Sequence, residues 1–271
     1  VRARSSMNIL AESNVPFGTA PGNHDLTFSD VIEEKTLPYV VNFGQKSLYL
    51  TTDPSKGRME EQPWYGGASA SGQSSYQIIK NVGLNILFLH LQVDARLPEL
   101  EWAKKVVKAH PNHYVILLTH RWIADYRIVR TRFGPFIYGT MESFYFPDSM
   151  GAQKTFEELV FPNKNIGMVL CGHIVGEVRR ISKNEFGLDV HELLSDYSNF
   201  SPRGGGGWMR LMEFDPSAQE IRVKTFSPTI ECESPPYEEK CGRERTHEDQ
   251  LAESKVVSER VAKRLCQSIQ S

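Results

Sequence analysis

The sequence predicts an α/β protein built on a mostly parallel or mixed β-sheet that is covered on both faces. In the first two thirds of the chain, short apolar runs alternate with helical patterns. Those runs are almost continuously apolar, as is typical of strands buried on both faces. After Gly176 the pattern changes to short segments in which apolar and polar residues alternate, which indicates half-buried antiparallel strands.

The first hundred residues contain one predicted helix end and two predicted strands. Residues 6–13 (SMNILAES) read as the end of a helix, and residues 15–20 (VPFGTA) as a buried strand. Residues 86–91 (ILFLHL) form a longer apolar run and predict a second buried strand.

A helix is expected to begin near Pro98 and to end before Pro111. Proline suits the first turn of a helix, and a proline just beyond the end is a common stop signal. Leu100, Ala103 and Val107 share one face of this helix and are expected to be buried. The elements expected next are a strand at 114–118, a short helix at 154–161 and a strand at 166–171.

Four alternating segments follow, and we expect them to form an antiparallel meander that supplies a second sheet. Turn signals such as Lys183-Asn184 and Asp215-Pro216 separate them. The segments are 177–182, 189–195, 208–214 and 220–226. Between two of them lies the glycine run RGGGGW, which is either a flexible loop or an anion-binding nest of backbone amides.

The composition divides the chain into a domain at residues 1–230 and a polar C-terminal extension at 231–271 that ends in a charged helix. Cys232 and Cys241 in the extension are either bridged or free. A bridge would favour an oxidising compartment, so an extracellular or periplasmic location is the favoured one.

The charge balance and the length of the apolar runs argue against a nucleic-acid partner and against a membrane span. With 31 basic and 33 acidic residues the formal net charge is −2, so no nucleic-acid partner is expected. The apolar runs are too short to span a bilayer, so no membrane span is expected either. The sequence does not indicate an oligomeric state.

Histidines follow three of the predicted buried strands directly. His24 stands in Gly22-Asn23-His24-Asp25, His120 in the sequence Thr-His, and His173 in the sequence Gly-His. Ligands of α/β proteins bind beyond the carboxyl ends of the strands, so these residues are candidates for one site. Imidazole and amide oxygen together suit a borderline divalent cation such as Zn, Mn or Fe.

This order of motifs resembles that of the calcineurin-like metallophosphoesterases. GNHD, then a strand-end TH, then a strand-end GH followed by Gly-Glu, carries the resemblance, which extends over about residues 5–230. The stretches PWYGG, ILFLHLQVD, HPNHYVILLTH, VLCGHIVGEVRR and VHELLSDY resemble a secreted or periplasmic-type branch of that family. The resemblance implies a layered fold of two mixed β-sheets flanked by helices.

The resemblance also implies roles for individual residues in the hydrolysis of a small phosphoester, either a monoester or a diester. Asn23, His120 and His173 would hold one metal of a pair, with Mn, Fe or Zn as the candidate ions. His24 would stabilise the transition state and protonate the leaving alkoxide, and Asp25 would hold the His24 ring. Two cations can clamp both ends of an in-line displacement, and a positioned general acid contributes about 10²–10⁴-fold.

The chain also departs from the family pattern. The family supplies its other metal from Asp-x-His and Gly-Asp motifs upstream of GNHD, and the residues before Gly22 contain neither. The last motif, Gly-His-x-His, has Val175 in its final position. We therefore expect an N-terminally incomplete phosphoesterase that lacks the first strands of the fold. The alternative is a degenerate, non-catalytic domain that binds an anion or a partner.

Three further features rank lower. His191 lies either near the site or simply packed in a strand. Arg121, with Arg127 or Arg130, could contact a substrate phosphate. Residues 124–148 are either a lid over the substrate or a surface loop. We find no motif of a serine hydrolase or a P-loop NTPase.

Overall fold

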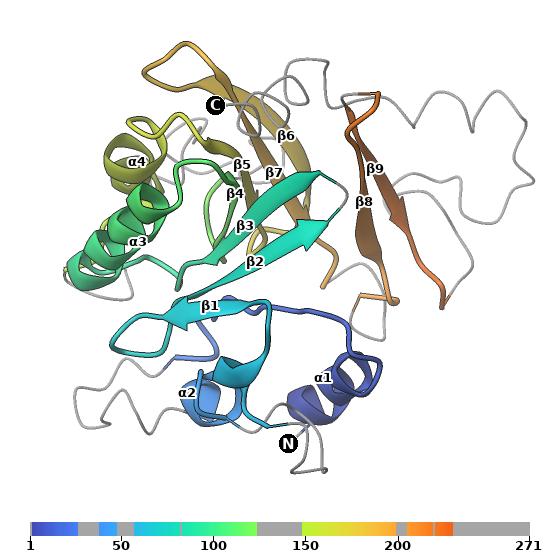
Figure 1. Ribbon diagram of the computed structural model, residues 1–271. Helices are drawn as coiled ribbons and strands as arrows, with labels where there is room; N and C mark the ends of the chain where they lie inside the picture. Colours follow the sequence, from blue (N-terminus) through green and yellow to red (C-terminus); the bar gives the residue numbers. More distant parts are fainter. Residues whose placement is uncertain are drawn as a thin grey trace, which may run out of the picture.

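The structure is a computed structural model that describes residues 2–26, 38–47, 57–81, 83–123, 148–198, 205–218 and 220–229. Within these residues a seven-stranded mixed sheet and a two-stranded sheet combine with a few helices (Figure 1). The predicted α/β class is therefore confirmed, whereas the finer assignment to the metallophosphoesterase fold stays a prediction.

The larger sheet has the strand order β1-β2-β3-β4-β5-β7-β6. Its strands are β1 Tyr65–Ala68, β2 Ser75–Asn81, β3 Leu84–His90, β4 Tyr114–Leu118, β5 Ile166–Cys171, β6 Gly176–Lys183 and β7 Asp189–Asp196. The central strands β3, β4, β5 and β7 are parallel, while β1, β2 and β6 pair in antiparallel fashion at the two edges. The carboxyl ends of the four parallel strands consequently lie at the same end of the sheet.

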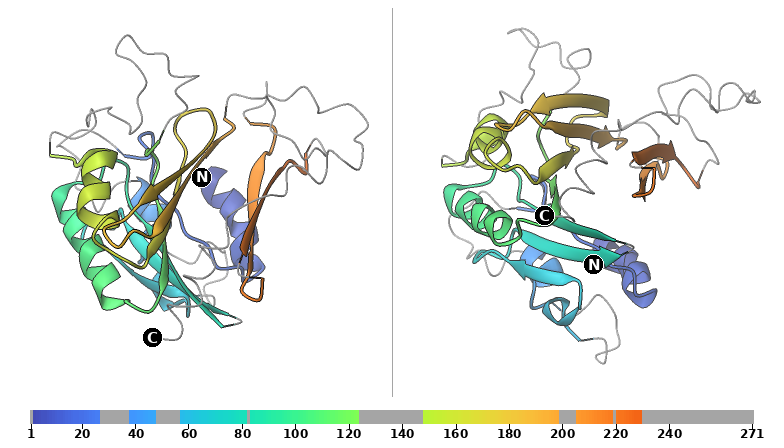
Figure 2. Two further views of the ribbon diagram at one scale, coloured as in Figure 1. Left: turned by 90° about the horizontal axis from the view of Figure 1, so that it is seen from above. Right: turned by 45° about the horizontal axis from the view of Figure 1, so that its top comes forward.

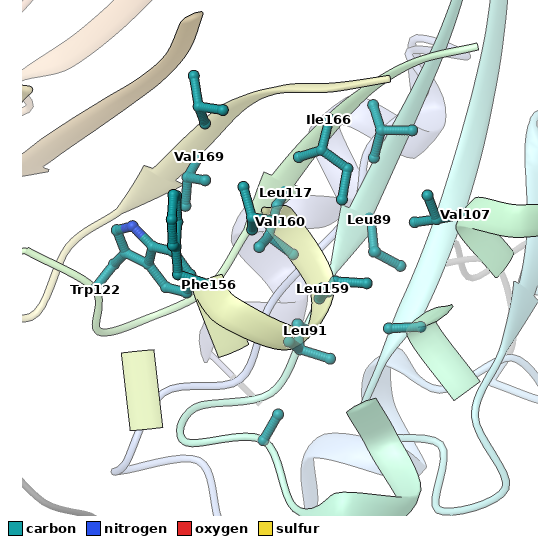
Figure 3. Close-up of a cluster of buried hydrophobic side chains, with 14 of the residues drawn as sticks. Leu89, Leu91, Val107, Leu117, Trp122, Phe156, Leu159, Val160, Ile166 and Val169 are labelled. Atoms are coloured by element: carbon teal, nitrogen blue, oxygen red, sulfur yellow. The ribbon is translucent and has the colours of Figure 1, made fainter. Parts of the chain in front are cut away.

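Helices α3 (Leu97–Ala109) and α4 (Gly151–Thr155) cover one face of the sheet, and a π-helical turn, η4 (Phe156–Val160), continues α4. Pro98 lies in the first turn of α3, as the sequence predicts. The apolar residues expected on its inner face (Leu100, Ala103 and Val107) are all buried. The main core fills the space between these helices and the sheet (Figure 3).

The opposite face is covered by the two-stranded antiparallel sheet, β8 (Met209–Asp215) and β9 (Glu220–Phe226). Its inner side chains, Met212, Phe214, Ile221 and Val223, belong to a second apolar cluster that includes residues of β3, β4, β5 and β7. Helix α1 (Arg2–Glu12) lies on this side as well (Figure 2). The short helices α2 (Pro38–Phe43) and η3 (Met59–Glu61) lie on the β1 side of the molecule (Figure 1).

Two expectations about strands were wrong. Residues 15–20 are not a buried strand: Val15 is 42% exposed, and hydrogen bonds of this segment and of Pro21 run to Leu10 and Val93 rather than along a neighbouring strand. Pro16 contributes to this outcome because it has no amide hydrogen to donate to a ladder. The expected meander is also divided, since β6 and β7 join the larger sheet and β8 and β9 alone form the second sheet.

Several sequence predictions lie outside the described residues. They concern the segment at 124–147 with Arg127 and Arg130, and the extension at 231–271 with Cys232 and Cys241. In the part of the chain that is described, no helix is long and apolar enough to cross a membrane.

Candidate metal centre

Two of the three expected metal ligands stand directly beyond neighbouring parallel strands. His120 follows β4 by two residues, and His173 follows β5 by two residues. The amide of Gly172 donates a hydrogen bond of 3.0 Å to the carbonyl of His120, which ties the two loops together. His173 has a φ of 69°, in the left-handed region that residues other than glycine seldom adopt.

The third expected ligand meets them from the turn at 22–25. Asn23 Oδ1 lies 2.8 Å from His120 Nε2, and His173 Nδ1 lies 3.0 Å from the same nitrogen. The two rings are 4.8 Å apart between centroids and are nearly perpendicular, at 71°. The structure therefore brings together all three residues that were predicted to share one metal.

Ordinary hydrogen bonding does not satisfy this arrangement well. The amide oxygen of Asn23 only accepts, so His120 Nε2 would have to carry a proton to bond with it. A neutral ring nitrogen that carries a proton cannot also accept one from His173 Nδ1. His120 Nε2 therefore has one proton at most for two close contacts, and it cannot form a full hydrogen bond with both Asn23 and His173.

The two rings are held in their neutral form, which is the form that binds a cation. Burial, together with the neighbouring His173 ring, lowers the pKa of His120 to about 4. The pKa of His173 is also lowered, first by burial and then by the Arg121 guanidinium. Both rings are therefore uncharged at neutral pH and can offer lone pairs.

A divalent cation fits these donors. Imidazole nitrogens bind zinc at about 2.0–2.1 Å in tetrahedral geometry, so two donors around one ion are about 3.3 Å apart. The observed separations of 2.8 and 3.0 Å are a few tenths of an ångström shorter than that spacing. Among the described residues no three His, Cys, Asp or Glu side chains converge on one point, so the amide oxygen of Asn23 is needed as the third donor.

The turn that carries Asn23 is closed by Asp25. The Gly22 amide donates a hydrogen bond of 2.9 Å to Asp25 Oδ2, and the Asp25 amide donates one of 3.1 Å to the Gly22 carbonyl. A Cβ at Gly22 would lie only 3.0 Å from the His120 ring, so glycine allows the turn to approach the ring closely. His24 itself is exposed, and its charge acts on the pKa values of both His120 and His173. The roles of His24 as acid and of Asp25 as its orienting partner stay predictions.

Arg121 is buried next to His120. Its guanidinium forms an ion pair with Asp94, with 3.1 Å between Nε and Oδ1 and a second contact from Nη2 to Oδ2. The two side chains are 5% and 2% exposed. Successive residues of an extended segment point to opposite sides, so His120 faces Asn23 while Arg121 faces away. The phosphate contact expected of Arg121 stays a prediction.

His191 is packed within the sheet rather than at the site. It is fully buried in β7 and pairs in register with Met168, three residues before the end of β5.

Cys171 precedes the Gly-His pair directly. Desolvation raises the pKa of its thiol to about 12, so the thiol stays protonated at neutral pH.

Two acidic residues near the centre escaped the sequence analysis. Asp196 ends β7, and its charge raises the pKa of both His120 and His173. Asp94 follows β3 and acts on His173 in the same direction. Asp196 could have been found with the signal that identified the histidines, namely a polar residue at the end of a buried strand.

A larger hollow lies elsewhere and does not carry comparable chemistry. It measures about 460 Å³ and is lined by Pro16, Trp64, Ile79, Lys80 and their neighbours. Lys80 is near the end of β2 that is remote from the carboxyl ends of the parallel strands, because Ser75, at the other end of β2, pairs with His90. The metal centre therefore remains the candidate site.

Comparison with known proteins identifies a relative, but that relative has no described activity. The chain is 28% identical over 234 residues to the uncharacterized protein YvnB of Bacillus subtilis (strain 168), in an alignment that covers 84% of this chain. The chain spans only 16% of the length of that relative. No model of a known protein family matches the chain. An assignment of function must therefore rest on the site itself.

Proposed function

We propose that this chain contributes a cation-binding half-site to metal-dependent hydrolysis of a phosphoester, in a fold of the layered metallophosphoesterase type. The convergence of Asn23 Oδ1 and His173 Nδ1 on His120 Nε2 carries the proposal. The order of the motifs, GNHD, TH and GH, supports it. The ions that suit such a donor set are Mn, Fe and Zn.

The cation site consists of Asn23, His120 and His173. A divalent cation bound there would act as a Lewis acid on a phosphoryl oxygen. Asn23 holds its oxygen toward His120 because the Gly22–Asp25 hydrogen bonds close the turn. The two imidazoles stay neutral because burial lowers their pKa values, so each has a nitrogen lone pair to offer.

His24 is the candidate general acid. It follows the ligand Asn23 directly and is exposed, so an incoming phosphoester can reach it. A ring nitrogen of His24 would give its proton to the leaving alkoxide oxygen, and the ring would regain a proton from solvent. Asp25 fixes the turn from which His24 projects, through its contacts with Gly22.

The test is titration of the purified chain with Mn²⁺, followed by calorimetry and by electron paramagnetic resonance. We expect saturable binding that is lost in Asn23→Ala, His120→Ala and His173→Ala and retained in His24→Ala. The control is His110→Ala, because His110 follows the carboxyl end of α3 and is not one of the proposed ligands. Binding that is absent in the parent chain, or that survives His120→Ala, would refute the cation site.

Hydrolysis of nitrophenyl phosphate and bis-nitrophenyl phosphate separates the two functions that the sequence leaves open. Turnover that falls by about 10²–10⁴-fold in His24→Ala, with Mn²⁺ binding intact, supports an enzyme. Cation binding without turnover of either ester favours the alternative, a non-catalytic domain that binds an anion or a partner.

A further inference from the structure

The ion pair between Asp94 and Arg121 is buried immediately behind the metal centre. Arg121 follows the ligand His120 directly, and Asp94 lies four residues beyond the end of β3 with a φ of 46°. Both oxygens of the Asp94 carboxylate contact the guanidinium. The pair is bidentate and almost fully withdrawn from solvent, at 5% and 2% exposure.

The pair does not lie where a substrate could touch it. It borders a cavity of about 10 Å³, which is also lined by Thr119, Trp122 and Thr155 among others. That volume holds about one water molecule and no larger ligand. The function of the pair must therefore be exerted through its neighbours.

The pair is next to the proposed cation site, because Arg121 directly follows the ligand His120 and its buried guanidinium is held by both oxygens of Asp94. In agreement with this placement, the guanidinium of Arg121 lowers the pKa of the His173 ring and the carboxylate of Asp94 raises it. A buried positive charge at this position would repel a cation held by the same ring. The carboxylate of Asp94 neutralises that charge through its ion pair with the guanidinium.

We infer that Asp94 is a positioning residue that sets the cation affinity of the centre by neutralising Arg121, the residue that directly follows the ligand His120. This inference rests on the proposed cation site. It predicts that the two members of the pair have unequal effects on cation binding, although the loss of either member disrupts the same buried pair. A purely structural role predicts that both losses weaken binding together.

The experiment measures the Mn²⁺ dissociation constant at pH 7.5 for Asp94→Asn, Arg121→Gln, Arg121→Lys and the double variant Asp94→Asn/Arg121→Gln. The melting temperature of each variant is recorded alongside. Asp94→Asn should weaken Mn²⁺ binding by about 10–100-fold, the range measured for residues that support metal ligands. Arg121→Gln should leave the affinity unchanged or make it tighter, Arg121→Lys should keep it within about threefold, and the double variant should recover most of the loss seen in Asp94→Asn.

Equal weakening in Asp94→Asn and Arg121→Gln, or no change in Asp94→Asn, would overturn the inference. If Asp94→Asn does not fold, the two Arg121 variants decide, because tenfold weaker binding in Arg121→Gln contradicts it and unweakened binding supports it. A parent chain that binds no Mn²⁺ refutes the proposed function itself and the inference with it. The two failures are distinguishable because only failure of the proposed function abolishes Mn²⁺ binding by the parent chain.

Discussion

The indole of Trp122 donates a hydrogen bond of 2.7 Å from Nε1 to Oε2 of Glu192, a carboxylate that is fully buried in β7. Arg180 in β6 reaches the same carboxylate with two further hydrogen bonds, of 3.2 and 2.7 Å. Trp122 follows His120, a proposed ligand, by two residues, so this contact fixes the chain just beyond the proposed metal centre to two other strands.

Removal of Glu192 should therefore destabilise the protein strongly. In Glu192→Ala, Arg180 and the Trp122 indole lose their shared acceptor, and breaking a buried ion pair costs about 3–5 kcal/mol. Urea denaturation followed by circular dichroism gives the free energy of unfolding. Glu185→Ala, at an exposed position, is the control and should change it by no more than about 0.5 kcal/mol. A loss below about 1 kcal/mol in Glu192→Ala would contradict this account of the network.

The core beneath the helices can be tested with two leucines that differ in burial. Leu117 in β4 is fully buried, whereas Leu97 at the start of α3 is 47% exposed. We expect Leu117→Ala to lower the free energy of unfolding by about 2–5 kcal/mol, because it removes buried apolar atoms and leaves a cavity. Leu97→Ala should cost much less. Equal losses would show that the core does not lie between these helices and the sheet.

Stability should fall as the pH drops from about 6.5 to 4. Burial lowers the pKa of His90 from 6.5 to about 4, so over this range the unfolded chain takes up a proton that the folded chain does not. The stability that His90 contributes is complete above pH 6.5 and is lost as the pH falls toward 4. The loss amounts to about 3 kcal/mol for this one ring. Urea denaturation at pH 7 and pH 4.5 should show a smaller difference in His90→Gln than in the parent chain, and an unchanged difference would exclude His90 as the cause.

Gly22 should be required for cation binding more than for stability. A Cβ at Gly22 would approach the His120 ring to 3.0 Å, so Gly22→Ala must displace either that ring or the turn carrying Asn23. We expect Mn²⁺ binding to weaken at least about tenfold while the melting temperature stays within a few degrees. Gly187→Ala is the matched control, because Gly187 has nothing within 4 Å but a φ of 70°, so this variant should lose stability without losing affinity. Tighter or unchanged binding in Gly22→Ala would argue against the close approach.

The sequence predicts those parts of the fold that depend on local pattern. The strands β3, β4 and β5 are short apolar runs, and α3 carries its own start signal and an apolar face, so each was expected at nearly its observed position. The strand β1 reads YGGA, which carries no such pattern and becomes a strand only through its pairing with β2. Residues 15–20 show the opposite case, because an apolar composition does not make a strand where none of the described strands pairs with it.

The same distinction applies to the proposed metal centre. That His120 and His173 lie together could be predicted because each follows a recognisable buried strand, and Asn23 could be added to them because it belongs to a specific motif. The contact between Asp94 and Arg121 joins residues 27 positions apart and depends on which way each side chain points beyond its strand. Neither residue type nor spacing reveals that direction, so this ion pair could not be predicted from the sequence.

The separation of the proposed metal ligands along the chain has a consequence for folding. Asn23 and His120 are 97 residues apart, and His120 and His173 are 53 apart, so no local segment holds two of these donors. An unfolded chain therefore cannot assemble the donor set, and a cation that binds these residues binds the native topology selectively. Such a cation adds RT ln(1 + [cation]/Kd) to the free energy of unfolding, or about 2.7 kcal/mol at a hundredfold excess over Kd. The proposed centre would thus assemble only after β4, β5 and the 22–25 turn have come together, and the gain in melting temperature with added Mn²⁺ would report the affinity of the folded chain for the ion.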